Sequence, residues 1–225
     1  MAERPAAHRA GVRKEIAMKT MLQATAICLL FAGSALALTG ERFPEIPLDK
    51  MTPAQRSVAD AILSGPRKEI GPPFDTWLRS PELTDRLAKL GEYLFFKTSL
   101  DNRVREMVVL MSAQFWGSQY EWYAHAPMAT KAGLDPATIA AIGAGRKPDN
   151  MKDDEAVAWE FTTQLRRDHG VDDAIYAKAV EKFGERGVVD LIALNGGYDL
   201  VSMTLNVARV SVPSDAQLPF KQAGR

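Results

Sequence analysis

Apolar residues in this 225-residue chain recur at helical spacing. From residue 82 they fall three or four positions apart, at Leu83, Leu87, Leu90, Leu94 and Phe95. Side chains at this spacing share one face of a helix. Similar patterns predict further helices over 103–116, 118–132, 153–168, 172–183 and 188–210, with a glycine pair at 196–197 as the weak point of the last. No segment shows the sustained alternation of a strand, so the expected fold is all-α in a single domain.

Three helix starts carry the same local signal. Thr52-Pro53, Ser80-Pro81 and Asp135-Pro136 each pair an N-cap side chain with proline. Proline is tolerated at the first helical position because the N–H that it lacks would have no partner there. Glycine–proline pairs at 65–66 and 71–72 predict loops between these helices. Gly133 is expected to end the helix over 118–132.

The N-terminal 37 residues resemble a targeting segment. Lys19 precedes an apolar run over 21–32, which ends in small residues at 34–37. This order is typical of a cleaved signal peptide. The run is short of the roughly 20 apolar residues that span a bilayer, although a retained N-terminal anchor is the alternative. The chain is therefore predicted to be exported, periplasmic or secreted, with no stable membrane association after cleavage.

Charge and cysteine content narrow the classes of partner. The chain holds 28 basic and 28 acidic residues without a block of either sign. This balance argues against nucleic acid or an anionic membrane surface as the main partner. The only cysteine, Cys28, lies in the predicted signal peptide, so the exported chain would depend on its core without disulfides.

The candidate chemistry lies around residues 106–125. Glu121 and His125 are one helical turn apart, so the carboxylate can orient the imidazole. Glu106 lies on the preceding predicted helix, and a return of the chain after Gly117 would bring it against the same face. Carboxylates and imidazole in apolar surroundings have shifted pKa values, which proton transfer requires. Ser118 and Trp122 share the face of Glu121 and His125.

Structural alternatives exist for each of these residues. Ser118 and Glu121 also match a capping box, in which both side chains only satisfy backbone N–H groups. Trp122 suits a core or a subunit interface, and His125 can be a hydrogen-bonded structural histidine. His169 is expected to lie at a helix end without a role in the site. The sequence lacks H-E-x-x-H and C-x-x-C, so no metal site is predicted; the alternative is a His–carboxylate site at an oligomer interface.

Two stretches then show a family resemblance. Arg-Glu-Met-Val-Val-Leu over 105–110 and Tyr-Glu-Trp-x-x-His over 120–125, followed by Ala129 and Gly133-Leu134, resemble the carboxymuconolactone decarboxylase family of alkylhydroperoxidase D-like proteins. The resemblance runs from about residue 81 to 213. It implies an all-helical fold that assembles into homotrimers or homohexamers. The expected organisation is an extension and signal peptide over 1–37, a Pro-rich lead and first helix over 38–80, the family domain over 81–213 and a tail over 214–225.

The resemblance also separates two branches of chemistry. The peroxidase branch carries C-x-x-C between a glutamate and a histidine, which match Glu106 and His125. Its two cysteines fall on Ser118 and Glu121 in this sequence. Because a thiolate is the nucleophile in peroxide reduction, the missing cysteines argue against a peroxidase. The decarboxylase branch also lacks the pair, and it acts on a carboxylated lactone without cofactor or metal.

The expected activity is that of a cofactor-independent lyase, decarboxylase or isomerase acting on a small lactone or carboxylated molecule. His125 is the predicted general acid and base, and Glu106 and Glu121 are its predicted carboxylate partners. The predicted substrate-binding residues are Ser118, Tyr120, Trp122 and Arg105. The alternative is a non-catalytic periplasmic protein that binds a small ligand.

Overall fold

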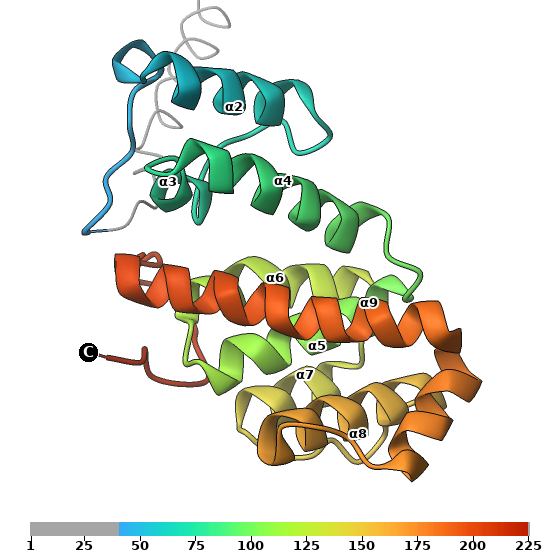
Figure 1. Ribbon diagram of the computed structural model, residues 1–225. Helices are drawn as coiled ribbons and strands as arrows, with labels where there is room; N and C mark the ends of the chain where they lie inside the picture. Colours follow the sequence, from blue (N-terminus) through green and yellow to red (C-terminus); the bar gives the residue numbers. More distant parts are fainter. Residues whose placement is uncertain (1–40, 225) are drawn as a thin grey trace, which may run out of the picture. The chain divides into compact units, whose positions relative to one another are not determined.

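The structure is a computed structural model that describes residues 41–224 (Figure 1). The predicted signal peptide and Cys28 lie outside the described residues. The chain divides into two compact units, 1–37 and 38–225, and every described residue belongs to the second. Within residues 41–224 the structure contains helices and no strand, which confirms the all-α prediction.

The described elements are η1 (Leu48–Lys50), α2 (Pro53–Ser64), α3 (Phe74–Trp77), α4 (Pro81–Phe96), α5 (Asn102–Phe115), α6 (Gln119–Lys131), α7 (Pro136–Gly143), α8 (Asp153–Asp168) and α9 (Asp173–Ala208). The three predicted helix starts at residues 52, 80 and 135 are confirmed. Thr52 forms a capping box with Gln55, and Asp135 accepts a hydrogen bond from the N–H of Ala137 at 2.7 Å. The short helix α3 carries no such signal and was not predicted.

Helix α5 is the centre of the fold. Each of its residues from 104 to 113 is buried, and α5 contacts α6, α7, α8 and α9 (Figure 1). Val104, Met107, Val108 and Leu110 are fully buried, and burial of each such side chain is worth roughly 1.5–3 kcal/mol. An ionisable residue on this helix must therefore be paired within the protein.

Helix α9 contains the two helices that the sequence predicts over 172–183 and 188–210. They meet at a kink at Gly184, whose backbone is non-helical with φ of 68°. The helix continues through the glycine pair at 196–197. A Cβ on Gly197 would approach the Leu94 side chain to 2.7 Å, so this glycine permits close packing of α4 on α9 rather than weakening the helix. The lack of space for a side chain at residue 197, and not a need for backbone flexibility, explains the glycine.

Helix α9 is also long and apolar enough, by length and composition, to cross a membrane. A core helix meets the same criteria, and 44% of its most apolar stretch is buried against the rest of the protein. Its contacts with α4, α5, α6 and α8 account for much of this apolar character.

Side-chain hydrogen bonds attach the segment before α5 to α9. Asp190 of α9 accepts hydrogen bonds from the Tyr93 hydroxyl and from the N–H and hydroxyl of Ser99, each at 2.7 Å. The indole N–H of Trp77 donates to the Thr204 hydroxyl at 3.0 Å. These contacts hold α3 and α4 over one side of α9.

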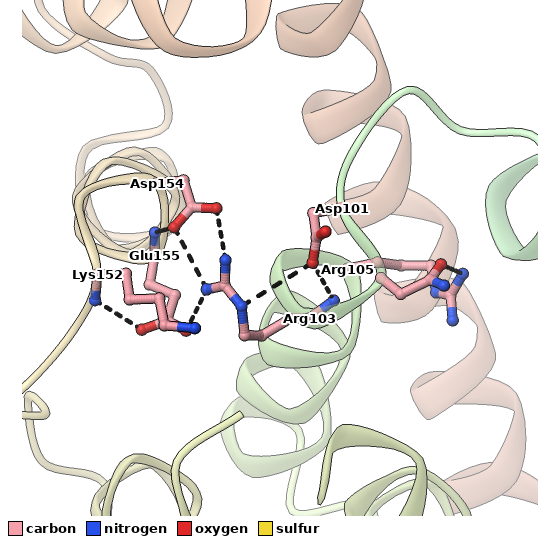
Figure 2. A network of polar contacts seen from close by, with 7 residues as sticks. Asp101, Arg103, Arg105, Lys152, Asp154 and Glu155 are labelled. Carbon is pink, nitrogen blue, oxygen red and sulfur yellow. Dashed lines mark hydrogen bonds and ion pairs between the residues drawn. The ribbon is translucent and has the colours of Figure 1, made fainter. Parts of the chain in front are cut away.

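A second polar network joins α5 to α8 (Figure 2). Arg103 of α5 binds Asp154 at 2.7 Å and also pairs with the buried carboxylate of Glu155. Glu155 in turn accepts a hydrogen bond from the Lys152 N–H at 2.8 Å. The network fixes the start of α8 against the start of α5.

Candidate active site

The centre of the site is a buried pair between α5 and α6. The Nδ1 atom of His125 lies 2.7 Å from Oε2 of Glu106. Glu106 is 0% exposed, and His125 is 8% exposed. The predicted convergence of these two residues is therefore present, across the Gly117 turn that separates their helices. With a proton on Nδ1, the bond to Glu106 leaves Nε2 as the nitrogen available for chemistry.

Arg105 holds Glu106 from the other side. Its guanidinium donates to Oε1 of Glu106 from Nη2 at 2.7 Å and from Nε at 3.0 Å. The remaining Nη1 donates to the Phe95 carbonyl and to Oδ1 of Asn102. Burial alone would raise the pKa of Glu106, but the bonds from His125 and Arg105 outweigh it and lower the pKa. Glu106 is therefore a fixed anion and not a proton donor.

Glu121 lies at the opposite nitrogen of the imidazole. Its Oε1 is 3.3 Å from Nε2 of His125, outside hydrogen-bond geometry, and this buried oxygen has no hydrogen-bond partner among the described residues. Burial raises the pKa of Glu121, although His125 acts in the opposite direction. The Glu121 carboxyl thus lies next to the free nitrogen of the imidazole, with a pKa above its ordinary value.

His125 has a raised pKa. Burial would lower the pKa, but Glu121 and the hydrogen bond to Glu106 outweigh that effect. Glu121 and His125 therefore interact electrostatically on the Nε2 side of the imidazole. An imidazole with a carboxyl beside its free nitrogen can both donate and accept a proton.

A cavity of about 260 Å³ opens beside this pair. Glu121 and His125 line it together with mainly apolar and aromatic side chains from α3, α4 and the second half of α9. The Tyr198 ring meets the His125 ring edge-on, at a centroid distance of 5.3 Å. The lining includes Phe74, Trp77, Leu87, Leu90, Leu94, Phe95, Tyr120, Met128, Leu200 and Val201.

Of the predicted substrate-binding residues, Tyr120 lines this cavity and the other three do not. Burial raises the pKa of Tyr120 to about 12, so it stays neutral. Trp122 instead packs edge-on against Phe220 at 5.4 Å. Arg105 lies behind Glu106, where all its hydrogen bonds are internal.

Ser118 occupies the N-cap position of α6 but makes no capping bond. Its hydroxyl is buried without a hydrogen-bond partner among the described residues. The N–H of Gln119 donates instead to Oε1 of Gln222, 3.1 Å away in the C-terminal tail. The capping-box alternative for Ser118 and Glu121 is therefore wrong, because the tail supplies the cap.

Within residues 41–224, no group of three or more His, Cys, Asp or Glu side chains is arranged to hold a metal ion. His169 ends α8 in the left-handed conformation, with φ of 60°. It lies at a helix end, as the sequence predicts.

Comparison with known proteins connects this geometry to a family. Residues 81–164 match the model of the Carboxymuconolactone decarboxylase family. The match supports the expected family for this part of the chain. No curated protein and no solved structure was found to match the chain. The matched segment contains Glu106, Glu121 and His125, and the match suggests a decarboxylase or alkylhydroperoxidase-like function.

Other cavity residues lie outside the matched segment. Arg67 precedes it, in the loop after α2, and Tyr198 follows it, on α9. Tyr198 directly follows the glycine pair at 196–197. Arg67 carries no motif, and only the folding of the 66–77 segment onto α4 places it at the cavity.

Proposed function

We propose that the protein is a cofactor-independent acid–base enzyme, a decarboxylase or isomerase acting on a small lactone or carboxylated molecule. The observation that carries the proposal is the chain of contacts Arg105–Glu106–His125–Glu121. One end of this chain is a fixed ion pair, and the other is an unbonded carboxyl oxygen beside the cavity. Such an arrangement orients an imidazole and leaves one nitrogen to exchange protons with a ligand.

In a decarboxylation, the bond between the carboxylate and the adjacent carbon breaks, carbon dioxide leaves, and the electron pair of the bond delocalises toward the neighbouring carbonyl as an enolate. A proton from Nε2 of His125 then passes to the carbon that lost the carboxylate. In an isomerisation, Nε2 of His125 removes a proton from one carbon and returns it at another. Glu106 stabilises the imidazolium in both cases, since its own pKa is lowered.

The two kinds of chemistry share one measurable event, which is proton exchange at a substrate carbon. We expect a screen of lactones and β-keto acids in heavy water to show deuterium incorporation, with carbon dioxide loss for substrates of the decarboxylase. The experiment compares His125→Asn with His169→Asn. Both remove an imidazole, but residue 169 lies at the exposed end of α8.

We expect His125→Asn to reduce the exchange rate at least about a hundredfold, the usual contribution of a general acid–base. His169→Asn should retain the native rate. Equal rates in the two variants, on a substrate that the native protein turns over, would contradict the proposal.

The apolar lining of the cavity favours one alternative function, the capture of a hydrophobic ligand without turnover. Under that alternative, a compound would raise the melting temperature and be recovered unchanged, without deuterium. A thiol peroxidase is disfavoured, because the only cysteine of the chain is Cys28.

We also propose export and self-association for this protein. Export is supported by the apolar run that follows Lys19, and self-association by large apolar side chains exposed on α9 at Val189, Ile192 and Val207. Fractionation of cells expressing the full chain tests export, and light scattering of the purified protein tests assembly. Retention in the cytoplasm, or a monomer at micromolar concentration, would contradict the respective proposal.

A further inference from the structure

Arg67 is a charged cavity residue that belongs neither to the family segment nor to the acid–base chain. It follows α2 in the loop that leads to α3, and its side chain is half-buried. The guanidinium carbon lies 5.0 Å from the centroid of the Phe74 ring. A Cβ built on Gly91 of α4 would be 4.0 Å from Nη2. The side chain thus lies near an aromatic ring and near a residue without a side chain.

This guanidinium forms no hydrogen bond or ion pair within residues 41–224, although its charge acts to lower the pKa of Glu121. The other arginines that pack into the fold differ, since Arg103, Arg105 and Arg166 each bind a carboxylate. A guanidinium carries five N–H donors in a planar fork that matches a carboxylate. At residue 67 these donors lie at a largely apolar cavity, where a charge-assisted hydrogen bond is stronger than in water.

The surrounding charges are few. Glu69 and Glu121 are the acidic residues that line the cavity, and His125 is the other basic one. Glu69 is exposed, and Glu121 is engaged with His125. Neither carboxylate forms an ion pair with Arg67.

We propose that Arg67 binds a carboxylate of the substrate, whose apolar remainder packs among the cavity's aromatic and aliphatic side chains. The substrate class is therefore a small hydrophobic or aromatic carboxylic acid. This inference rests on the proposed function for the location of the reaction, and it assigns Arg67 to substrate recognition. A carboxylate held equally in the ground and transition states gains affinity without acceleration, so loss of Arg67 should raise KM more than it lowers kcat.

Binding of a matched ligand pair tests the proposal directly. The probes are trans-cinnamate and cinnamamide, which share shape but differ in charge, with Kd measured by calorimetry at neutral pH. The variants are Arg67→Gln, Arg67→Lys and the control Arg56→Gln. Arg56 is paired with Asp60 on α2 at 2.7 Å and does not line the cavity.

We expect the native protein and Arg56→Gln to bind cinnamate about tenfold or more tighter than the amide, the effect of one charge-assisted pair. Arg67→Gln should reduce that preference to less than about twofold, and Arg67→Lys should keep part of it because the positive charge remains. A preference that persists in a folded Arg67→Gln variant would overturn the proposal. So would a native protein that binds the two probes equally or binds neither.

Failure of this proposal is distinguishable from failure of the proposed function. His125→Asn should abolish proton exchange but retain the preference for the carboxylate, since Arg67 is intact. Carboxylate preference without proton exchange in the native protein would support Arg67 as the anion site and reject the enzyme. Proton exchange that depends on His125, together with an unchanged carboxylate preference in Arg67→Gln, would support the enzyme and reject Arg67 as the anion site.

Discussion

Replacing Glu106 by glutamine removes one charge from the centre of the site and keeps its shape. The amide oxygen can still accept the Nδ1–H bond of His125, which is 2.7 Å long in the native protein. An opposite charge at this separation raises a histidine pKa by about one to three pH units. We therefore expect the pKa of His125 to fall by at least about one unit in Glu106→Gln, equivalent to about 1.4 kcal/mol.

The substitution also affects stability. Buried Arg105 would lose its anion while keeping its bonds to Phe95 and Asn102, and loss of one partner of a buried ion pair costs about 3 kcal/mol or more. The native His125 pKa lies above the ordinary 6.5. Its contribution to stability is therefore full below pH 6.5 and is lost as the pH rises through the folded-state pKa. Glu106→Gln should weaken this loss of stability with rising pH.

Nuclear magnetic resonance of the histidine ring protons, followed by pH titration, measures the pKa values. His169 provides an internal reference, and Glu155→Gln is the matched control. Glu155 is also a buried glutamate paired with an arginine, but it does not contact His125. Glu155→Gln should destabilise the protein without moving the His125 titration. If His125 titrated at the same pH in Glu106→Gln as in the native protein, the electrostatic account of the site would be refuted.

Three further predictions concern the elements that surround the site. Burial and Glu45 raise the pKa of Asp75 to about 6 from 3.8, so the free energy of unfolding falls as the pH rises through this interval. Asp75→Asn should therefore raise the free energy of unfolding at pH 7 by up to about 3 kcal/mol, measured by urea unfolding. A variant less stable than the native protein would contradict this prediction. Asp190→Ala leaves the donors on residues 93 and 99 without their acceptor, and should lower the free energy of unfolding by about 2–4 kcal/mol. Amide hydrogen exchange in the 97–100 loop should become faster. Unchanged exchange would show that Asp190 does not hold this loop. Gln222→Ala removes the cap of α6 and should lower stability by about 1 kcal/mol in urea unfolding; the native unfolding midpoint in this variant would show that the tail does not cap the helix.

Local signals account for much of the fold. The starts of α2 and α7 follow from a capping side chain and a proline, whereas α4 begins at its proline without a capping bond from Ser80. Helix α8 begins and ends at the predicted residues 153 and 168. The break between the two helices of α9 was expected, but the weak point expected at residues 196–197 is absent. Gly184 takes a positive φ, whereas Gly197 packs closely against Leu94, and only the packed structure distinguishes these reasons.

The sequence also predicts part of the site and misses another part. The pairing of Glu121 with His125 follows from helical spacing, and the convergence of Glu106 was expected from a return of the chain at Gly117. The position of Arg67 depends on contacts between residues distant in sequence, such as Trp77 with Thr204. Gln222 caps a helix that begins 103 residues earlier, which no local pattern can indicate.

The cavity wall formed by residues 66–77 comes from a different part of the chain than the acid–base residues. Residues 66–77 can therefore be changed without altering an acid–base residue. The rest of the wall, including Leu87, Leu90 and Tyr120, lies within the segment that holds the acid–base residues. A library that varies only residues 66–77 is the economical starting point for altering what this protein accepts.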